Sequence, residues 1–251
     1  MHRFFSIVLI FFLSVPTGVL GKDKSNASDS THTFECRDVV LPLMMVTAAS
    51  TGLYTNTVKN FNWDVRDAAS TLSKGVPIKA DDYVQYLPVV AYMGLDFATG
   101  NARHSLLDRT IITTTSYLAM GVMVNTIKYT VRELRPDGST RNSFPSGHSA
   151  TAFMGAELVR IEYGGLYGAG AYAIACGIGF LRIYNNRHWA TDVLAGAGIG
   201  ILSARIGYWM LPLNKKLFKP GKSSKRSLVL MAAPAYEPLS GAYGAAVSLS
   251  F

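Results

Sequence analysis

Residues 163–213 read YGGLYGAGAYAIACGIGFLRIYNNRHWATDVLAGAGIGILSARIGYWMLPL. Two apolar segments, 163–181 and 193–213, lie in this stretch, and only Arg205 interrupts the second. Apolar runs of this length predict helices. Gly196, Gly200 and Ala204 recur every four residues, so they share one helical face and allow a second helix to approach closely. The stretch therefore predicts closely packed apolar helices.

Four further apolar segments precede this stretch, at residues 39–58, 83–95, 110–127 and 149–159. A membrane span needs roughly 20 apolar residues, whereas shorter runs suit buried core helices. Only two or three of the six segments reach that length, and 39–58 contains Pro42 and several hydroxyl side chains. We expect an all-α fold over 39–213, a bundle of about six apolar helices.

The two ends of the chain have a different composition. Residues 1–21 have a basic start, an uncharged apolar run and a small residue at the end, which predicts a signal peptide, with an uncleaved anchor helix as the alternative. Residues 22–38 predict a loose polar leader. Residues 214–226 form a basic linker, either solvated or binding anionic lipid head groups. Alternation with period two over 227–251 predicts a short C-terminal β-hairpin, with assembly of such hairpins into an oligomer as the alternative.

The composition excludes several classes of protein. The 251 residues are 49% hydrophobic and 16% charged, against about 25% charged in an ordinary soluble domain. This excludes a disordered chain, and two cysteines exclude a disulfide scaffold. Cys36 and Cys176 are either a disulfide or two buried thiols. The net charge of +8 is concentrated in a few motifs and the tail, which disfavours nucleic acid as a partner.

The first motif is basic and covers residues 128–136, KYTVRELRP. Lys128, Arg132 and Arg135 are spaced by four and three residues, so we expect them on one helical face that Pro136 ends. Three cations on one face repel each other unless an anion lies between them. The alternative is a solvated basic face.

The second motif covers residues 144–152, FPSGHSATA. Pro145 and Gly147 predict a turn, and the small residues after it predict a helix. Free backbone N–H groups at the helix N-terminus, with the Ser146 hydroxyl, can bind an anion, and His148 lies beside them. An ordinary turn and helix cap is the alternative.

The third motif covers residues 182–192, RIYNNRHWATD. A helix that starts near His188 would place His188 and Asp192 on one face. Asp192 can then accept the imidazole N–H and leave the other ring nitrogen as a nucleophile. Arg182 adds a guanidinium suited to phosphate. A surface His–Asp pair is the alternative.

The three motifs, K-x6-R-P, P-S-G-H and R-x5-H-x3-D, resemble in order and spacing those of the type 2 phosphatidic acid phosphatase and vanadium haloperoxidase superfamily. The resemblance covers about residues 80–212 and implies a helical bundle of that superfamily's kind. Leu181 departs from it, because many members have Ser before the Arg.

The resemblance also implies the role of each residue. His188 is the expected nucleophile, forming a phosphohistidine that Asp192 orients, and His148 is the expected general acid. No metal and no cofactor are expected. The groups expected to bind the phosphate oxygens are Lys128, Arg135, Ser146, Gly147 and Arg182. Arg132 and Arg187 match no position of the motifs.

The expected function is that of a metal-independent phosphatase. Its substrate would be a phosphate monoester or pyrophosphate of an envelope lipid, of the lipid A, undecaprenyl pyrophosphate or phosphatidic acid type. The short gap between the first two motifs resembles compact bacterial envelope lipid phosphatases. The alternative is a secreted acid phosphatase of broad specificity with the same site. A haloperoxidase and a non-enzymatic envelope protein are further alternatives.

The expected location is the inner membrane, with the site facing the periplasm. The chain would be soluble in the periplasm or associated with the outer membrane in the alternative readings. If residues 39–58 and the next two segments all span, the site instead faces the cytoplasm. The expected partner is the lipid substrate, and the oligomeric state stays open.

Overall fold

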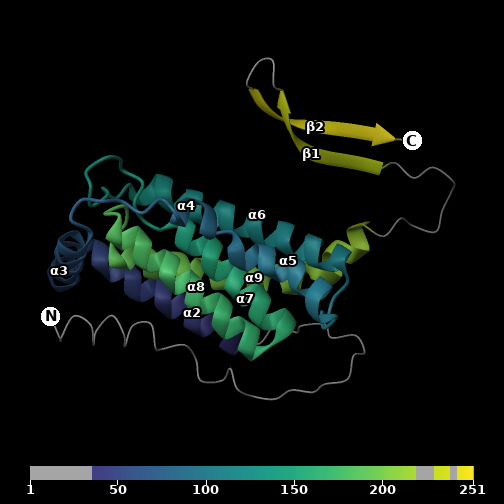
Figure 1. Cartoon of the computed structure of the whole chain (residues 1–251), viewed down its shortest axis with the longest axis horizontal. Helices are drawn as coiled ribbons and strands as arrows, with labels where there is room; N and C mark the ends of the chain where they lie inside the picture. Colours follow the sequence, from purple (N-terminus) through teal and green to yellow (C-terminus); the bar gives the residue numbers. More distant parts are fainter. Residues whose placement is uncertain (1–35, 219–228, 238–241, 251) are drawn as a thin grey trace. The chain divides into compact units, whose positions relative to one another are not determined.

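The computed structural model describes residues 36–218, 229–237 and 242–250, and it confirms the predicted all-α bundle with a C-terminal hairpin. Each of the six apolar segments forms a helix (Figure 1). The apolar helices are α2 (Cys36–Ser50), α5 (Leu87–Thr99), α6 (Leu106–Val131), α7 (Gly147–Tyr163), α8 (Gly165–Tyr184) and α9 (Ala190–Phe218). The predicted signal peptide lies outside the described residues and stays a prediction.

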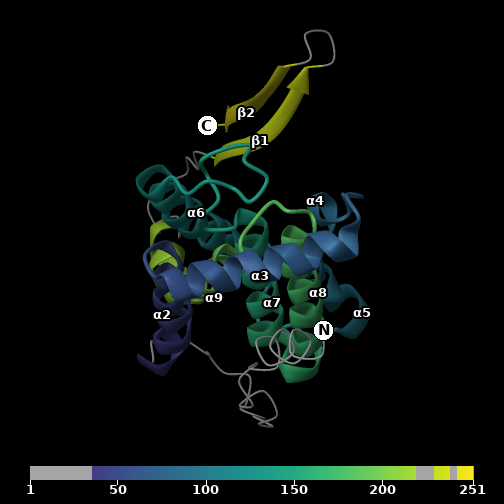
Figure 2. The ribbon, with the colours of Figure 1, turned by 90° about the vertical axis from the view of Figure 1, so that its left-hand side faces the viewer.

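Two further helices were not predicted, α3 (Asn56–Ser73) and α4 (Asp81–Val84). The segment 39–58 is not continuous, because α2 ends at Ser50, a 3-10 turn (Thr51–Leu53) follows, and the chain bends by 92° into α3. As a result α3 lies across one end of the bundle (Figures 1 and 2). Charged and polar side chains are frequent in α3, so a search for apolar runs does not detect it.

Two predicted boundaries need correction. α2 begins at Cys36, whereas we expected the polar leader to continue to residue 38; Asp38 in the first turn favours the helix N-terminus. α9 continues to Phe218, past the expected start of the basic linker at 214, because Lys215 and Lys216 suit the last turn of a helix. Both cysteines are unpaired, and Cys36 is exposed rather than buried.

The small-residue face of α9 allows the close packing expected of it. A Cβ atom at Gly196 would collide with the carbonyl of Ser146, the residue before α7, and one at Gly200 would collide with the Ala150 carbonyl of α7. On the other side of α9, Gly198 contacts α2 at Pro42. These contacts fix the N-terminal ends of α7 and α9 against each other, which matters because both ends carry motif residues.

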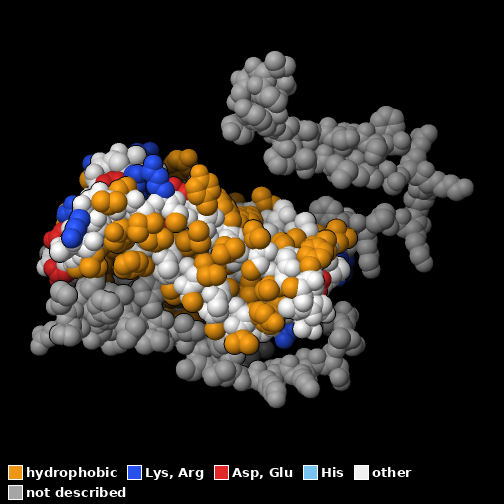
Figure 3. Space-filling view, viewed as in Figure 1, with side chains coloured by type: hydrophobic (Ala, Val, Ile, Leu, Met, Phe, Trp, Pro, Cys, Tyr) orange, Lys and Arg blue, Asp and Glu red, His pale blue; other side chains and the backbone are white. Residues whose placement is uncertain are grey.

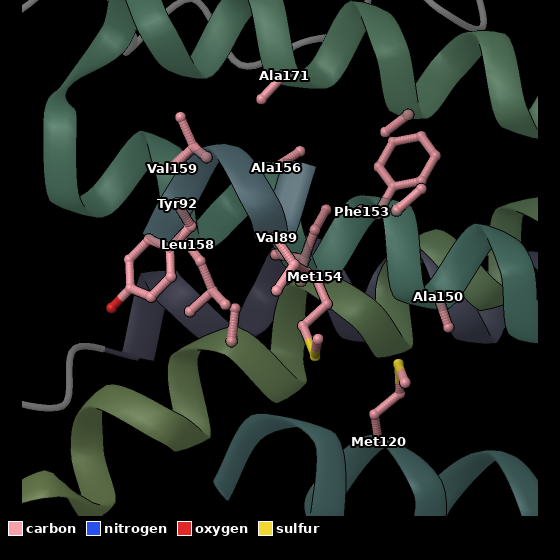
Figure 4. Close-up of a cluster of buried hydrophobic side chains, with 14 of the residues drawn as sticks. Val89, Tyr92, Met120, Ala150, Phe153, Met154, Ala156, Leu158, Val159 and Ala171 are labelled. Atoms are coloured by element: carbon pink, nitrogen blue, oxygen red, sulfur yellow. The ribbon is translucent and has the colours of Figure 1, made fainter. Parts of the chain in front are cut away.

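The main hydrophobic core lies between α5, α6, α7, α8 and α9. α7 is the central helix, and most of its side chains are buried. Figure 4 shows Tyr92 of α5 and Met120 of α6 in the same cluster as Phe153, Met154 and Leu158 of α7. The core thus holds together helices whose ends meet at the site.

Arg205, the one charge within the apolar part of α9, is paired inside the bundle. Its Nε lies 2.5 Å from Glu157 Oε1 of α7, and its Nη1 lies 2.5 Å from Asp38 Oδ1 of α2. Glu157 also accepts hydrogen bonds from Arg160 and from the Tyr172 hydroxyl of α8. The charge therefore links four helices.

Three helices are long and apolar enough to cross a membrane, namely α6, α8 and α9, and a fourth span is possible if the bent α2–α3 pair counts as one. Many large apolar side chains are exposed, including Leu107, Leu118 and Val122 of α6. Figure 3 shows apolar side chains over the length of the bundle and charged ones gathered mainly at the end near α3. This pattern is typical of a protein surrounded by lipid.

The C-terminal residues form a separate unit that starts at Leu213. Its strands β1 (Val229–Glu237) and β2 (Ala242–Ser250) pair antiparallel, with Val229 opposite Ser250 and Glu237 opposite Ala242. The predicted β-hairpin is therefore confirmed, with the first strand extending four residues beyond Ala233.

Candidate active site

The three motifs meet at one end of the bundle. Lys128 lies in the last turn of α6, His148 in the first turn of α7, Arg182 in the last turn of α8, and Asp192 in the first turn of α9. Neighbouring helices in the bundle thus contribute the ends that face the same region. α3 adjoins this end, because Asn62 donates a hydrogen bond to Thr191.

The first motif does not form one basic helical face, and that prediction is wrong. α6 ends at Val131, and Arg132 adopts a left-handed conformation with φ of 52°. Pro136 disfavours helix in the residue before it, and Arg135 instead lies in a turn whose N–H donates to the Thr140 carbonyl. Arg135 and Lys128 still lie close enough to interact electrostatically, while Arg132 is exposed to solvent.

The second motif forms the predicted turn and helix start. α7 begins at Gly147, and Ser146 caps it by accepting from the Ser149 N–H at 3.4 Å. The Ser146 hydroxyl also accepts from the Ser149 hydroxyl at 3.0 Å. The first N–H groups of α7, including that of Gly147, have no helical acceptor, as in any helix start. Ser146 N donates to the Asp192 carbonyl at 2.9 Å and so ties this turn to the third motif.

The third motif brings His188 to Asp192 without a shared helix, because α9 begins only at Ala190. His188 Nδ1 lies 3.4 Å from Asp192 Oδ2, and both side chains are buried, at 3% and 0% exposed. Asp192 Oδ2 also accepts from the Trp189 N–H at 2.9 Å. With Nδ1 facing the carboxylate, Nε2 is the nitrogen left to react.

His188 is neutral at physiological pH. Burial, the largest effect, lowers its pKa from 6.5 to about 4, against the opposing hydrogen bond and charge of Asp192. The cations Arg182 and Lys128 lower this pKa further. A neutral imidazole with its proton on Nδ1 has a lone pair on Nε2, which is what a nucleophile needs.

Two guanidinium groups at the site have a buried N–H without a hydrogen-bond partner among the described residues. These are the Nε atoms of Arg135 and Arg182, and the two side chains interact electrostatically. Buried donors are nearly always paired in proteins, so two orphaned donors on neighbouring cations fit a site for an anion. Among the described residues, no cluster of His, Cys, Asp or Glu has the make-up of a metal site.

Four acidic or hydroxyl side chains at the site were not predicted. Asp81 of α4 pairs with Arg182 at 2.5 Å, and Asp82 lies 3.1 Å from His148 Nε2. Ser143 donates to Asp192 Oδ2 at 2.5 Å, and Glu133 lies beside Asp192. The position of Asp81 and Asp82 directly before an apolar segment could have marked them as candidate site residues. Nothing local marks Ser143 or Glu133.

Most of the predicted site residues lie together, and Arg187 has a partner outside this group. Lys128, Arg135, Ser146, His148 and His188 are brought together with Arg182, Asp192 and the N-terminus of α7 at Gly147. Arg187 is directed to Asp137, with which it forms an ion pair at 3.1 Å. The site therefore contains both histidines, the aspartate and the three expected cations.

Comparisons with known proteins show a family match and one similar curated protein. A family model described as PAP2 superfamily matches residues 109–216. A lipid A 1-phosphatase of Porphyromonas gingivalis is 36% identical over 205 residues, which are 76% of this chain and 46% of that protein. The chain thus spans about half the length of that curated relative.

Among solved structures, the fold is similar to that of a transmembrane PAP2-type phosphatidylglycerolphosphate phosphatase from Bacillus subtilis. The TM-score is 0.51 at 20% sequence identity, over 74% of this chain and 98% of the other. At this identity the likeness concerns the fold.

Proposed function

The chain carries a PAP2 superfamily domain over residues 109–216, and from this premise we propose that it is a phosphatase acting on a phosphorylated lipid. The reaction hydrolyses a phosphate monoester or pyrophosphate of that lipid by way of a phosphohistidine. One observation carries the proposal: a buried, neutral His188 contacts Asp192 through Nδ1 and interacts with the cations Arg182 and Lys128.

In the first step, His188 Nε2 attacks phosphorus. The N–P bond forms and the bond from phosphorus to the leaving oxygen breaks, which places positive charge on the imidazole. Asp192 compensates that charge through Nδ1. The leaving oxygen takes its proton from His148, which lies in the first turn of α7.

In the second step, water attacks the phosphohistidine. His148, now neutral, accepts a proton from that water as the O–P bond forms and the N–P bond breaks, so both histidines return to their starting states. Lys128, Arg135 and Arg182 stabilise the charge on the phosphate oxygens in both steps, with the Ser146 hydroxyl and the Gly147 N–H at the helix start.

The exposed apolar surface supports a lipid as the substrate. The site lies at the ends of helices long enough to cross a membrane, so a lipid held in the bilayer can present its head group there without leaving the membrane. The name of the curated relative, a lipid A 1-phosphatase, supports a phosphorylated glycolipid as one candidate substrate.

We further propose that the site faces the periplasm from the inner membrane. α9 begins beside the site and continues to Lys215 and Lys216, and 29 residues of helix span about 43 Å. These two lysines are therefore at the opposite end of α9. The positive-inside rule favours the cytoplasm for that end, which leaves the site on the periplasmic side.

The decisive experiment for activity uses the purified full chain in detergent. Phosphate release is measured from lipid A, undecaprenyl pyrophosphate, phosphatidic acid and phosphatidylglycerolphosphate. We expect His188→Ala to abolish release from whichever lipids the native chain hydrolyses. Radiolabelled substrate, quenched with base during turnover, should leave an acid-labile, base-stable phosphoprotein in the native chain and none in the His188→Ala variant.

The control variant is Arg103→Ala, which also truncates a basic side chain to alanine and is purified in the same way. Arg103 is exposed and lies between α5 and α6, at the far end of α6 from Lys128. We expect full activity from this variant. Normal turnover by the His188→Ala variant would contradict the mechanism.

Orientation is tested by thiol labelling in intact cells. In a background with Cys36→Ser and Cys176→Ser, a cysteine is introduced by Ser139→Cys near the site or by Asn101→Cys at the other end; both positions are exposed. We expect an impermeant reagent to label only the Ser139→Cys variant. Labelling of only the Asn101→Cys variant would place the site in the cytoplasm.

A secreted acid phosphatase with the same site is the second candidate. It predicts an active, monodisperse enzyme in washed periplasm without detergent and hydrolysis of many water-soluble monoesters. The exposed apolar side chains of α6 favour the membrane-bound form instead.

A further inference from the structure

Asp192 has one carboxylate oxygen that no donor in the described residues satisfies. Its Oδ2 accepts from Ser143 Oγ and Trp189 N and contacts His188, whereas its Oδ1 is buried without a hydrogen-bond partner. The side chain is fully buried, so solvent does not satisfy that oxygen. A buried acceptor without a donor costs free energy.

A second buried oxygen without a partner among the described residues is Oε2 of Glu133, and the Glu133 carboxyl interacts with Asp192. The segment containing Glu133 is held in place by its backbone, because Ser143 N donates to the Glu133 carbonyl at 3.0 Å. The Glu133 carboxyl is within hydrogen-bonding reach of Asp192. Ionised carboxylates only accept hydrogen bonds, so these two neighbouring carboxyl groups can bond to each other only if one of them carries a proton.

We propose that Glu133 is protonated in the resting protein and donates this hydrogen bond to Asp192 Oδ1, as a positioning residue for the proposed phosphatase reaction. The bond fixes the plane of the Asp192 carboxylate, so that Oδ2 is directed at His188 Nδ1. It also keeps the negative charge on Asp192, where the imidazolium formed during the reaction needs it. The pair holds one proton and one negative charge.

The surrounding charges agree with this assignment. Burial, followed by the charge of Asp192, raises the pKa of Glu133 to about 9. Lys59 of α3 acts in the opposite direction by favouring the ionised form. On the Asp192 side, the facing groups are His188 and the cations Lys128 and Arg135, and both cations interact with the Asp192 carboxylate. The proton therefore belongs on Glu133.

The test compares two substitutions at Glu133 with the native chain at pH 7, with a lipid substrate that the native chain hydrolyses. Glu133→Gln has an amide N–H that can donate to Asp192 Oδ1, while Glu133→Leu has no donor. We expect kcat of the Gln variant to stay within about threefold of the native value. We expect the Leu variant to lose about 10- to 100-fold in kcat, the range for a hydrogen bond to a charged group.

An infrared measurement tests the proton itself and does not depend on activity. The carbonyl band of a protonated carboxylic acid should be present in the native chain, absent in the Glu133→Gln variant, and lost on titration with a midpoint near 9. Lys59→Gln should move that midpoint to higher pH. This readout remains valid if the Leu variant fails to fold.

Two results would overturn the inference. One is a carboxylic acid band that persists in the Glu133→Gln variant, and the other is a Gln variant as inactive as the Leu variant. Either result leaves the proposed function standing as long as His188→Ala is inactive. Turnover by the His188→Ala variant would instead remove the proposed function, whatever the state of Glu133.

Discussion

Asp82 Oδ1 lies 3.1 Å from His148 Nε2 and 3.6 Å from Arg182 Nη1, so one carboxylate contacts both the proposed general acid and a proposed phosphate ligand. Burial and the nearby Arg182 lower the pKa of His148, whereas Asp82 raises it by accepting a hydrogen bond and by its charge. Asp82 thus helps His148 to keep the proton that the leaving oxygen needs.

We predict that Asp82→Asn makes the pH optimum more acidic. Without the carboxylate, the pKa of His148 falls further, so the loss of kcat/KM on the alkaline side should begin at lower pH. The check is a profile of kcat/KM against pH for the native chain and the variant. Asp64→Asn, which changes an exposed carboxylate on α3, serves as the control. An alkaline limb that stays in place would contradict a link between Asp82 and His148.

The acid limb of the same profile is predicted to belong to His188. Its pKa of about 4 means that the nucleophile is neutral above that pH and becomes protonated, and therefore inactive, below it. In the native chain, kcat/KM should fall on the acid side with a midpoint near 4, and ¹⁵N NMR of labelled imidazole should report the same transition. A midpoint near the ordinary value of 6.5 would mean that His188 is not desolvated.

Ser143→Ala is predicted to lower kcat with little change in KM. Its hydroxyl donates to Asp192 Oδ2 at 2.5 Å and restrains the carboxylate. A hydrogen bond to a charged group contributes about 1.5–3 kcal/mol, so kcat should fall about 10- to 100-fold if the bond is used fully in the transition state. Ser139→Ala, in the exposed part of the same loop, should change neither constant. Unchanged kcat in the Ser143 variant would show that the hydroxyl does not act through Asp192.

Sequence patterns predicted those parts of the protein that depend on local order. Long apolar runs gave the six helices of the bundle, and the small residues Gly196 and Gly200 gave the close approach of α9 to α7. The turn before His148 follows from its Pro and Gly, and the contact of His188 with Asp192 was expected from their spacing, although the two residues do not share a helix. In each case the signal lies within a short stretch of sequence, although the helix that Gly196 and Gly200 approach is distant in the chain.

The parts that sequence did not predict depend on contacts between distant segments. Asp82 reaches His148 across 66 positions, and Ser143 reaches Asp192 across 49. Glu133 lies within the first motif, but the early end of α6 at Val131 turns it towards Asp192, and helical spacing gave no sign of this. Such contacts arise only when the helix ends meet in three dimensions.

The close contact of α7 and α9 predicts a stability effect with a control inside the same bundle. A Cβ at Gly200 would collide with the Ala150 carbonyl and the Met154 nitrogen of α7, whereas a Cβ at Gly121 of α6 has no neighbour within 4 Å. We expect Gly200→Ala to lower the free energy of unfolding by about 1–3 kcal/mol through overpacking. Gly121→Ala should raise it by about 0.5–1 kcal/mol, because Ala restricts the unfolded chain more than Gly.

The measurement is thermal or denaturant unfolding of both variants in the same detergent micelle, with phosphate release assayed in parallel. Because α7 carries His148 and α9 carries Asp192, separation of the two helices should also lower kcat in the Gly200 variant. Equal stability of the two variants would mean that α7 and α9 can move apart at no cost. In that case the helix contact would not be what holds the two motifs in register.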